Sequence, residues 1–83
     1  MRIYTPIKRA IERHALKDYP REACGLIIAV GDKQKYIRCR NTAEDGQDFR
    51  LPAEDYAAAE DAGQVLAVVH SHVDTPALPS EAD

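Results

Sequence analysis

Apolar residues between positions 5 and 18 recur every three or four residues, with charged residues between them. This spacing predicts an amphipathic helix. The residues on its apolar face are Ile7, Ala10, Ile11, His14 and Ala15. Thr5 is expected to cap the helix, with Pro6 in its first position. The helix should end at Tyr19-Pro20, because the residue before a proline disfavours the helical conformation.

A continuous apolar run over residues 23–30 predicts a strand that is buried on both faces. Residues 31–33 suit a tight turn, and residues 35–40 alternate between polar and apolar positions. The two segments should therefore pair as a β-hairpin. Residues 41–48 are polar and predict a loop, after which residues 49–51 predict a short strand.

A second helix should begin at Pro52 and end near residue 62, with Gly63 as its C-cap. Residues 65–70 are apolar and rich in valine, which predicts another strand. Two prolines stiffen residues 73–79, which we expect to form a loop. This order of elements predicts one α/β domain of the layered α+β kind, with a hairpin and a mixed β-sheet flanked by helices.

A chain of 83 residues allows one small domain with a thin core. Its formal charge is −3 and no basic stripe is visible, which argues against a nucleic-acid partner. The longest apolar run, residues 26–30, is too short to span a bilayer, and no signal peptide is visible, so no membrane partner is expected. Cys24 and Cys39 are too few for a disulfide framework, so we expect free thiols in a reducing cytoplasm.

The end of the chain reads His70-Ser71-His72, then seven residues, then Ser80-x-x-Asp83. Side chains two apart on a strand project from the same side, so both imidazoles can reach one ion. Histidine nitrogen and carboxylate oxygen are ligands of zinc sites that keep one position for water. A lone His-x-His is usually just a polar strand end, and Ser80-x-x-Asp83 taken alone favours a capping motif that opens a helix. Taken together, the two motifs favour a metal site.

Glu22 comes just before the buried strand predicted at residues 23–30. An acid in that place is often a solvated edge residue. Beside an activated water it can also serve as a general base. The sequence alone leaves both interpretations of Glu22 open.

These residues together resemble the JAMM/MPN zinc metalloprotease family. The segment Pro-Arg-Glu-Ala-Cys-Gly-Leu over residues 20–26 and the pattern His-x-His-x7-Ser-x2-Asp over residues 70–83 carry the resemblance. Asn41 and residues 49–52 also resemble the middle segment of the family. The resemblance extends from about residue 14 to the last residue, and is strongest to the bacterial and phage tail-assembly branch.

The resemblance implies a single domain over residues 1–83 with a cytidine-deaminase-like JAMM core. Family domains continue past the motif aspartate with a helix and further strands, so the domain is expected to be incomplete at its C-terminal side. The roles that the resemblance implies are Zn²⁺ ligation by His70, His72 and Asp83, proton transfer from water by Glu22, and hydrogen bonding of the developing oxyanion by Ser80.

The implied activity is hydrolysis of a peptide or isopeptide bond by metal-activated water. The expected substrate is a peptide or protein, including a ubiquitin-like or sulfur-carrier conjugate. The expected setting is the cytoplasm of a bacterium or of a phage-infected host, with tail assembly as one role. Apolar surface left uncovered by the absent segments would favour self-association.

Two other functions are compatible with the sequence. The first is an inactive scaffold of the same fold that serves protein–protein contact, although the chain keeps every metal residue of the motif. The second is a redox or structural-metal module built on Cys24 and Cys39, with His70 and His72 completing a Cys₂His₂ site. The spacing of these residues does not match zinc-finger patterns, which counts against the second function.

Overall fold

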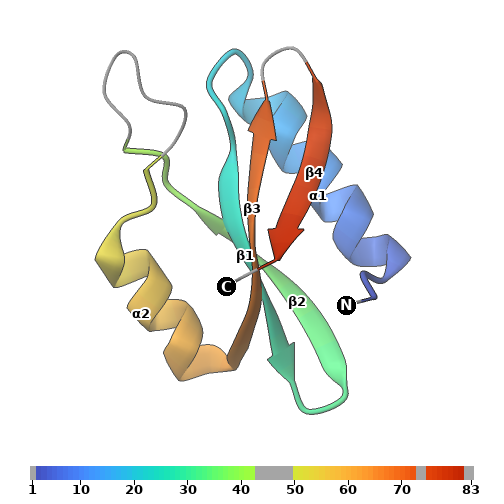
Figure 1. Cartoon of the computed structure of the whole chain (residues 1–83), viewed down its shortest axis with the longest axis vertical. Helices are drawn as coiled ribbons and strands as arrows, with labels where there is room; N and C mark the ends of the chain where they lie inside the picture. The colour runs from blue at the N-terminus through green and yellow to red at the C-terminus, as the bar shows by residue number, and fades with distance from the viewer. Residues whose placement is uncertain (1, 43–49, 73–74, 82–83) are drawn as a thin grey trace.

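The structure is a computed structural model that describes residues 2–42, 50–72 and 75–81, with side chains over 2–42 and 50–71 (Figure 1). Its elements in chain order are α1 (Thr5–Asp18), β1 (Cys24–Val30), β2 (Lys33–Cys39), α2 (Ala53–Ala62), β3 (Gln64–His72) and β4 (Thr75–Glu81). One sheet separates the two helices, as Figure 1 shows. This arrangement confirms the layered α+β class.

The sheet has the strand order β2-β1-β3-β4, and each neighbouring pair is antiparallel. We expected a mixed sheet. The connection through α2 does join two parallel strands, β2 and β3. The strand β1 lies between them and runs the opposite way, so no two adjacent strands among those described are parallel.

Both faces of the central strand β1 are covered. The cluster on the α1 side consists of Ile7, Ile11, Ile27, Ala67 and Val69. The cluster on the α2 side consists of Cys24, Leu26, Ile28, Cys39 and Ala59. Leu26, Ile27 and Ile28 are 0% exposed, although they point alternately to the two sides. This confirms the prediction that the apolar run is buried on both faces.

The helix α1 occupies the predicted residues, but its cap differs from the prediction. Tyr4 is the N-cap residue, and Thr5 already belongs to the helix. The carbonyl of Tyr4 accepts hydrogen bonds from the backbone N–H groups of Ile7 and Lys8, and no side chain caps the helix. The expected capping role of Thr5 is therefore wrong. The predicted end is confirmed, because the helix ends at Asp18.

The β-hairpin predicted from the alternating pattern is confirmed. The pairing of β1 with β2 extends from Val30 opposite Lys33 to Cys24 opposite Cys39. Gly31 has a φ angle of 62°, in the left-handed region that glycine enters without strain. A short turn in this conformation matches the right-handed twist of the two strands, which is why the hairpin closes here.

The segment after the hairpin is partly as predicted. Helix α2 has Pro52 as N-cap and Gly63 as C-cap, and the Gly63 N–H donates to the carbonyl of Ala59 at 3.0 Å. The short strand predicted at residues 49–51 is wrong for residues 50 and 51, and residue 49 lies outside the described residues. The backbone N–H of Arg50 donates to the side chain of Asn41 and not to a neighbouring strand.

The loop predicted at residues 73–79 is wrong over its described part. Thr75–Glu81 forms β4 and pairs with the edge of β3, with Leu78 opposite His70 and Ser80 opposite Val68. Prolines are tolerated in such an edge strand, where a missing N–H can face solvent. Ser80 is part of this strand and does not open a helix within the described residues.

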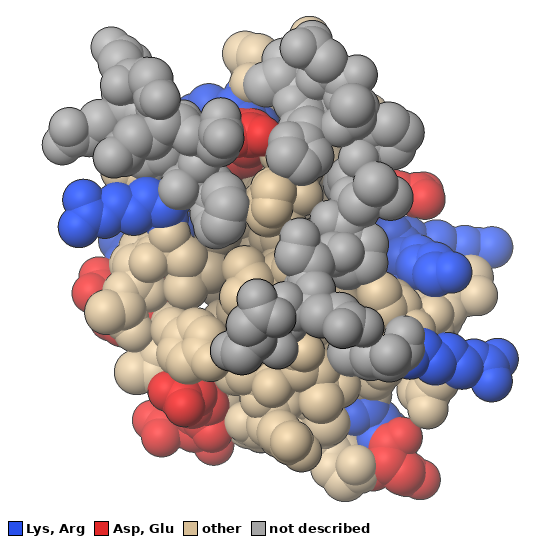
Figure 2. All heavy atoms as spheres, in the orientation of Figure 1, with Lys and Arg blue, Asp and Glu red and all other residues tan. Residues whose placement is uncertain are grey.

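The two helices carry opposite charge. In Figure 2 a group of acidic residues lies over α2, and basic residues lie on the side of α1 and β2 and also at the left of the view, on the α2 side. On α1, Arg9, Arg13 and Lys17 are exposed and four residues apart, so they form one stripe. The expected absence of a basic stripe is therefore wrong, and the argument that it supplied against a nucleic-acid partner no longer holds.

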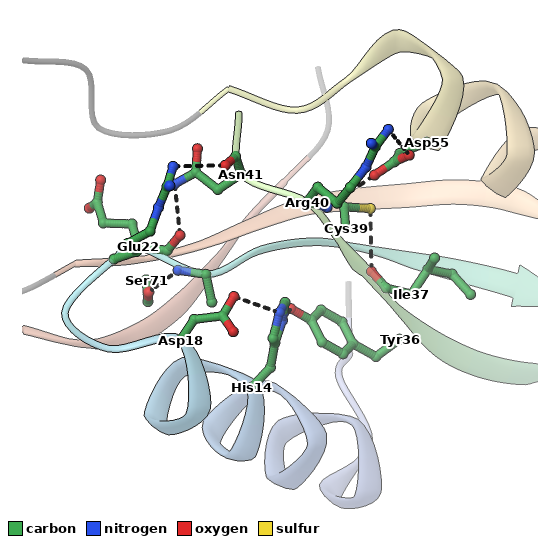
Figure 3. A network of polar contacts seen from close by, with 12 residues as sticks. His14, Asp18, Glu22, Tyr36, Ile37, Cys39, Arg40, Asn41, Asp55 and Ser71 are labelled. Carbon is green, nitrogen blue, oxygen red and sulfur yellow. Dashed lines mark hydrogen bonds and ion pairs between the residues drawn. The ribbon is translucent and has the colours of Figure 1, made fainter. Parts of the chain in front are cut away.

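A hydrogen-bonded chain joins α1 to β2. His14 is buried, its Nδ1 lies 2.7 Å from the hydroxyl of Tyr36, and its Nε2 lies 3.1 Å from a carboxylate oxygen of Asp18 (Figure 3). Gly25 on β1 leaves the space for the phenol ring, because a Cβ atom there would overlap it. These hydrogen bonds, together with the packing of Tyr36 over Gly25, fix how α1 lies across the sheet.

Acid should destabilise the fold through His14. Burial lowers the pKa of His14 from 6.5, Arg38 and Lys17 add to the effect, and Asp18 opposes it. The unfolded chain therefore takes up a proton before the folded chain does. The stabilisation is complete above about pH 6.5 and is lost as the pH falls toward the folded-state pKa. We expect up to about 1.4 kcal/mol lost per pH unit, measured by urea unfolding.

The matched variant for this test is His14→Gln, which keeps a polar side chain that does not titrate. Its unfolding free energy should change less steeply below about pH 6.5 than that of the parent. A parent that gains stability from His14 as the pH falls would contradict the prediction. That result would mean that Asp18 holds a proton on the folded imidazole.

Candidate active site

The start of β1 and the end of β3 meet at one end of the sheet. Cys24 lies opposite His70 in the antiparallel register. One residue further, the Ser71 N–H donates to the carbonyl of Ala23 at 3.0 Å, and the Ala23 N–H donates to the Ser71 hydroxyl at 2.7 Å. Figure 3 shows Ser71 beside the segment that carries Glu22. The first residues of the motif, His70 and Ser71, therefore lie next to the segment that carries the predicted general base.

The alternation of side chains along β1 and β3 places Cys24 and His70 on one face of the sheet. Cys24 belongs to the cluster on the α2 side, and its register partner is His70. Val69 belongs to the α1 side, so the next residue of β3 faces α2. Glu22 precedes Cys24 by two residues, and we infer the same side for it. Glu22 is 8% exposed, so it is not the solvated edge residue that the sequence left open.

Asn41, just after β2, connects the segments around Glu22. Its side-chain Nδ2 donates to the backbone carbonyl of Glu22 at 2.8 Å. Its Oδ1 accepts from the backbone N–H of Arg50 at 2.9 Å. The guanidinium of Arg21 donates to the backbone carbonyl of Asn41 at 2.8 Å. One residue thus ties together the approach to β1, the exit from β2 and the approach to α2 (Figure 3).

Arg40 anchors the start of α2 next to Asn41. Its backbone N–H donates to Asp55 at 3.0 Å, and its guanidinium lies 2.7 Å from Glu54 and 3.4 Å from Asp55. The backbone hydrogen bond from Arg40 is the main reason that the pKa of Asp55 is lowered. Arg40 and Glu54 are exposed and Asp55 is partly buried, so the contact contributes orientation more than stability.

Part of the predicted site lies outside the described residues. His72 and Ser80 are described in their backbone only, and Asp83 is outside the described ranges. The backbone of Ser80 lies two register positions from that of Leu78, the partner of His70. Among the described side chains no three histidine, cysteine or acidic residues group around one point. Zinc ligation by His70, His72 and Asp83 and the roles of Glu22 and Ser80 therefore stay predictions.

The two cysteines form a cross-strand pair beneath this end of the sheet. Cys24 and Cys39 lie opposite each other on β1 and β2, both buried and both free thiols. Burial raises the pKa of the Cys24 thiol to about 12 and that of Cys39 to about 11. Thiols that resist ionisation are poor nucleophiles and poor metal ligands. Their environment favours packing over redox chemistry.

The sequence predicts no role for Ser71. It was only the residue between the two histidines, yet its hydroxyl accepts a buried backbone N–H and it is 6% exposed. Asn41 was singled out only by resemblance, and its three contacts become visible in the tertiary structure alone.

The family described as prokaryotic homologues of the JAB domain matches the chain over residues 5–83. An α+β fold with a buried glutamate beside a strand that ends in His-x-His agrees with that match. The chain belongs to this family of JAB, or JAMM/MPN, domains, which confirms the resemblance seen in its motifs.

Two kinds of relative share this domain. The chain is 51% identical over 75 residues to tail tip assembly protein K of Escherichia phage N15, covering 89% of the chain and 31% of that protein. It is 33% identical over 89 residues to CysO-cysteine peptidase of Mycobacterium bovis and Mycobacterium tuberculosis, covering 98% of the chain and 61% of the peptidase. The chain thus spans about a third of the tail tip assembly protein and about three-fifths of the peptidase.

No solved structure matches the chain. Over the ranges that the structure describes, neither helix is both long enough and apolar enough to cross a membrane.

Replacing Ser71 by alanine should weaken the junction between β1 and β3. The substitution leaves the buried N–H of Ala23 without its acceptor, which costs about 1–3 kcal/mol. The free energy of unfolding in urea measures the loss. Thr42→Val is the control, because the Thr42 hydroxyl donates to the carbonyl of Arg50 at an exposed position. Equal stability of Ser71→Ala and the parent would show that the hydroxyl does not stabilise this junction.

The thiols should be protected in the folded protein. At about pH 8, iodoacetamide should alkylate Cys24 and Cys39 at least ~100-fold more slowly in the folded than in the urea-unfolded chain, because the thiolate is the reactive species. Mass spectrometry follows the reaction. Rapid alkylation that added zinc suppresses would instead support a metal module on the cysteines.

Proposed function

We propose that the domain is a zinc-dependent metallopeptidase or isopeptidase that hydrolyses a peptide or isopeptide bond. The observation that carries the proposal is the junction of β1 with β3. It brings the buried Glu22 and the imidazole of His70 to one face at one end of the sheet, and His72 follows two residues further along the same strand. A carboxylate and two strand histidines in this order support metal-assisted hydrolysis.

The donor set that we propose is of the kind that zinc accepts, histidine nitrogen and carboxylate oxygen. Of its members only His70 has a described side chain, and it offers an imidazole near the end of β3, opposite the start of β1. In the proposal His70, His72 and Asp83 hold the ion. When bound, Zn²⁺ supplies a Lewis acid that polarises the scissile carbonyl and makes water easier to deprotonate.

The residues of the chain supply the proton transfers. Glu22 accepts a proton from the attacking water and returns it to the leaving amine as the carbon–nitrogen bond breaks. Ser80 donates a hydrogen bond to the oxygen on which negative charge develops. The buried position of Glu22 keeps competing water away from this exchange.

The relatives support a protein or a conjugate of a small carrier protein as the substrate. One relative is named a CysO-cysteine peptidase, and its domain aligns with nearly the whole chain. By this analogy we propose a substrate in which a small group or peptide is joined to a carrier protein, in the cytoplasm of a bacterium or of a phage-infected cell.

A second candidate is a protein-interaction scaffold in tail assembly. The observation that favours it is the 51% identity to a protein named for tail tip assembly. The scaffold and the peptidase differ in their need for metal. Partner binding that survives chelation and the substitution His70→Ala would support the scaffold.

Replacing Glu22 by glutamine should abolish hydrolysis without removing the metal. We expect about 10²–10⁴-fold lower kcat, because glutamine cannot accept the proton. The natural protein that carries this sequence is loaded with zinc and tested on CysO–cysteine and on labelled casein. Atomic emission should find about one zinc per chain in parent and variant, and a chelator should stop the reaction of the parent.

Glu60→Gln is the matched control, since it makes the same change at an exposed position of α2. It should leave kcat unchanged. Failure of the parent to bind about one zinc per chain would refute the proposal, and so would a Glu22→Gln variant as active as the parent.

A further inference from the structure

We propose that Asn41 is a positioning residue that sets the direction of the Glu22 side chain. The inference rests on the proposed function of Glu22, and it adds a residue to which the motif assigns no role. It starts from one peptide group, the one that joins Glu22 to Ala23.

Both polar atoms of the Glu22–Ala23 peptide group are held by side chains. Its carbonyl oxygen accepts from Nδ2 of Asn41 at 2.8 Å, and its N–H donates to the hydroxyl of Ser71 at 2.7 Å (Figure 3). A peptide group is planar, so two bonds at opposite ends fix the orientation of the whole plane. That plane borders the Cα atom of Glu22 and therefore limits where its Cβ atom points.

Strand pairing does not hold the carbonyl of the Glu22–Ala23 peptide group. The strand β1 begins at Cys24, so the carbonyl of Glu22 precedes the regular ladder. A carbonyl of a buried residue needs a donor, and here Asn41 after β2 supplies one. The side chain thus replaces a backbone bond at the one residue for which we propose proton transfer.

The amide of Asn41 is itself fixed in one orientation. Its Oδ1 accepts from the backbone N–H of Arg50 at 2.9 Å, and a backbone N–H can only donate. The other end of the amide must then be the donor, which matches the acceptor carbonyl of Glu22. Arg21 also donates to the backbone carbonyl of Asn41, which holds its main chain in place.

Thr42 provides a neighbouring contact of a different kind. Its backbone N–H and its hydroxyl both donate to the carbonyl of Arg50, at 2.9 and 3.1 Å. Like the bond from Arg50 to Asn41, these bonds join the segment after β2 to Arg50, but they do not involve Glu22. Thr42→Val removes one of them and is therefore the matched control for a purely structural effect.

The test uses Asn41→Asp and Asn41→Ala in the natural protein, loaded with zinc. Aspartate keeps an acceptor for Arg50 but cannot donate to the carbonyl of Glu22 when ionised. Both variants should lower kcat about 10- to 100-fold, since small misplacements of a catalytic group have effects of this size. The KM value and the zinc content should stay as in the parent, and Thr42→Val should keep the parent kcat.

An unchanged kcat in Asn41→Asp would overturn the proposal. So would a loss of kcat that goes with an equal loss of bound zinc, or an equal loss of kcat in Thr42→Val. If the zinc-loaded parent itself does not hydrolyse its substrates, the proposed function fails, and ¹⁵N relaxation then decides on Asn41. Increased motion of the Glu22 and Ala23 amides in Asn41→Asp, but not in Thr42→Val, supports its positioning role. Unchanged motion in both variants overturns it.

Discussion

The pairing of β1 with both of its neighbours is the constraint on which the rest of the structure depends. The strand β1 pairs with β2 along one edge and with β3 along the other, and its two faces pack in the clusters on the α1 side and the α2 side. Each of these contacts buries apolar surface, and burial of this kind is the main source of stability in a small domain. A strand held on four sides has one register. That register brings the start of β1 to the end of β3 and creates the candidate site.

The polar residues around the site mainly position the backbone. Ser71, Asn41 and Arg40 form their described hydrogen bonds with peptide groups or with acids at the start of α2, at the places where strand pairing stops. Such bonds are modest in net free energy but costly to lose once buried. They let a domain with a thin core hold the ends of its strands as firmly as their centres.

The family assignment and the site answer different questions. The match to the JAB domain assigns the chain to its family. Its relatives include a peptidase and a tail assembly protein, and the chain spans only part of each. Substrate choice depends on surfaces around the site more than on the shared core. The charge difference between α1 and α2 is one such surface property.

Local patterns in the sequence determined most of the helices and strands. The helix over residues 5–18, the hairpin and the second helix depend on spacing and on turn residues, which act between near neighbours. The site chemistry that the motif predicts stays a prediction. The tertiary structure decided what depends on distant neighbours: the antiparallel order of the sheet and the contacts of Asn41 and Ser71. Those features need partners far apart in the chain, and a pattern along one segment carries no information about them.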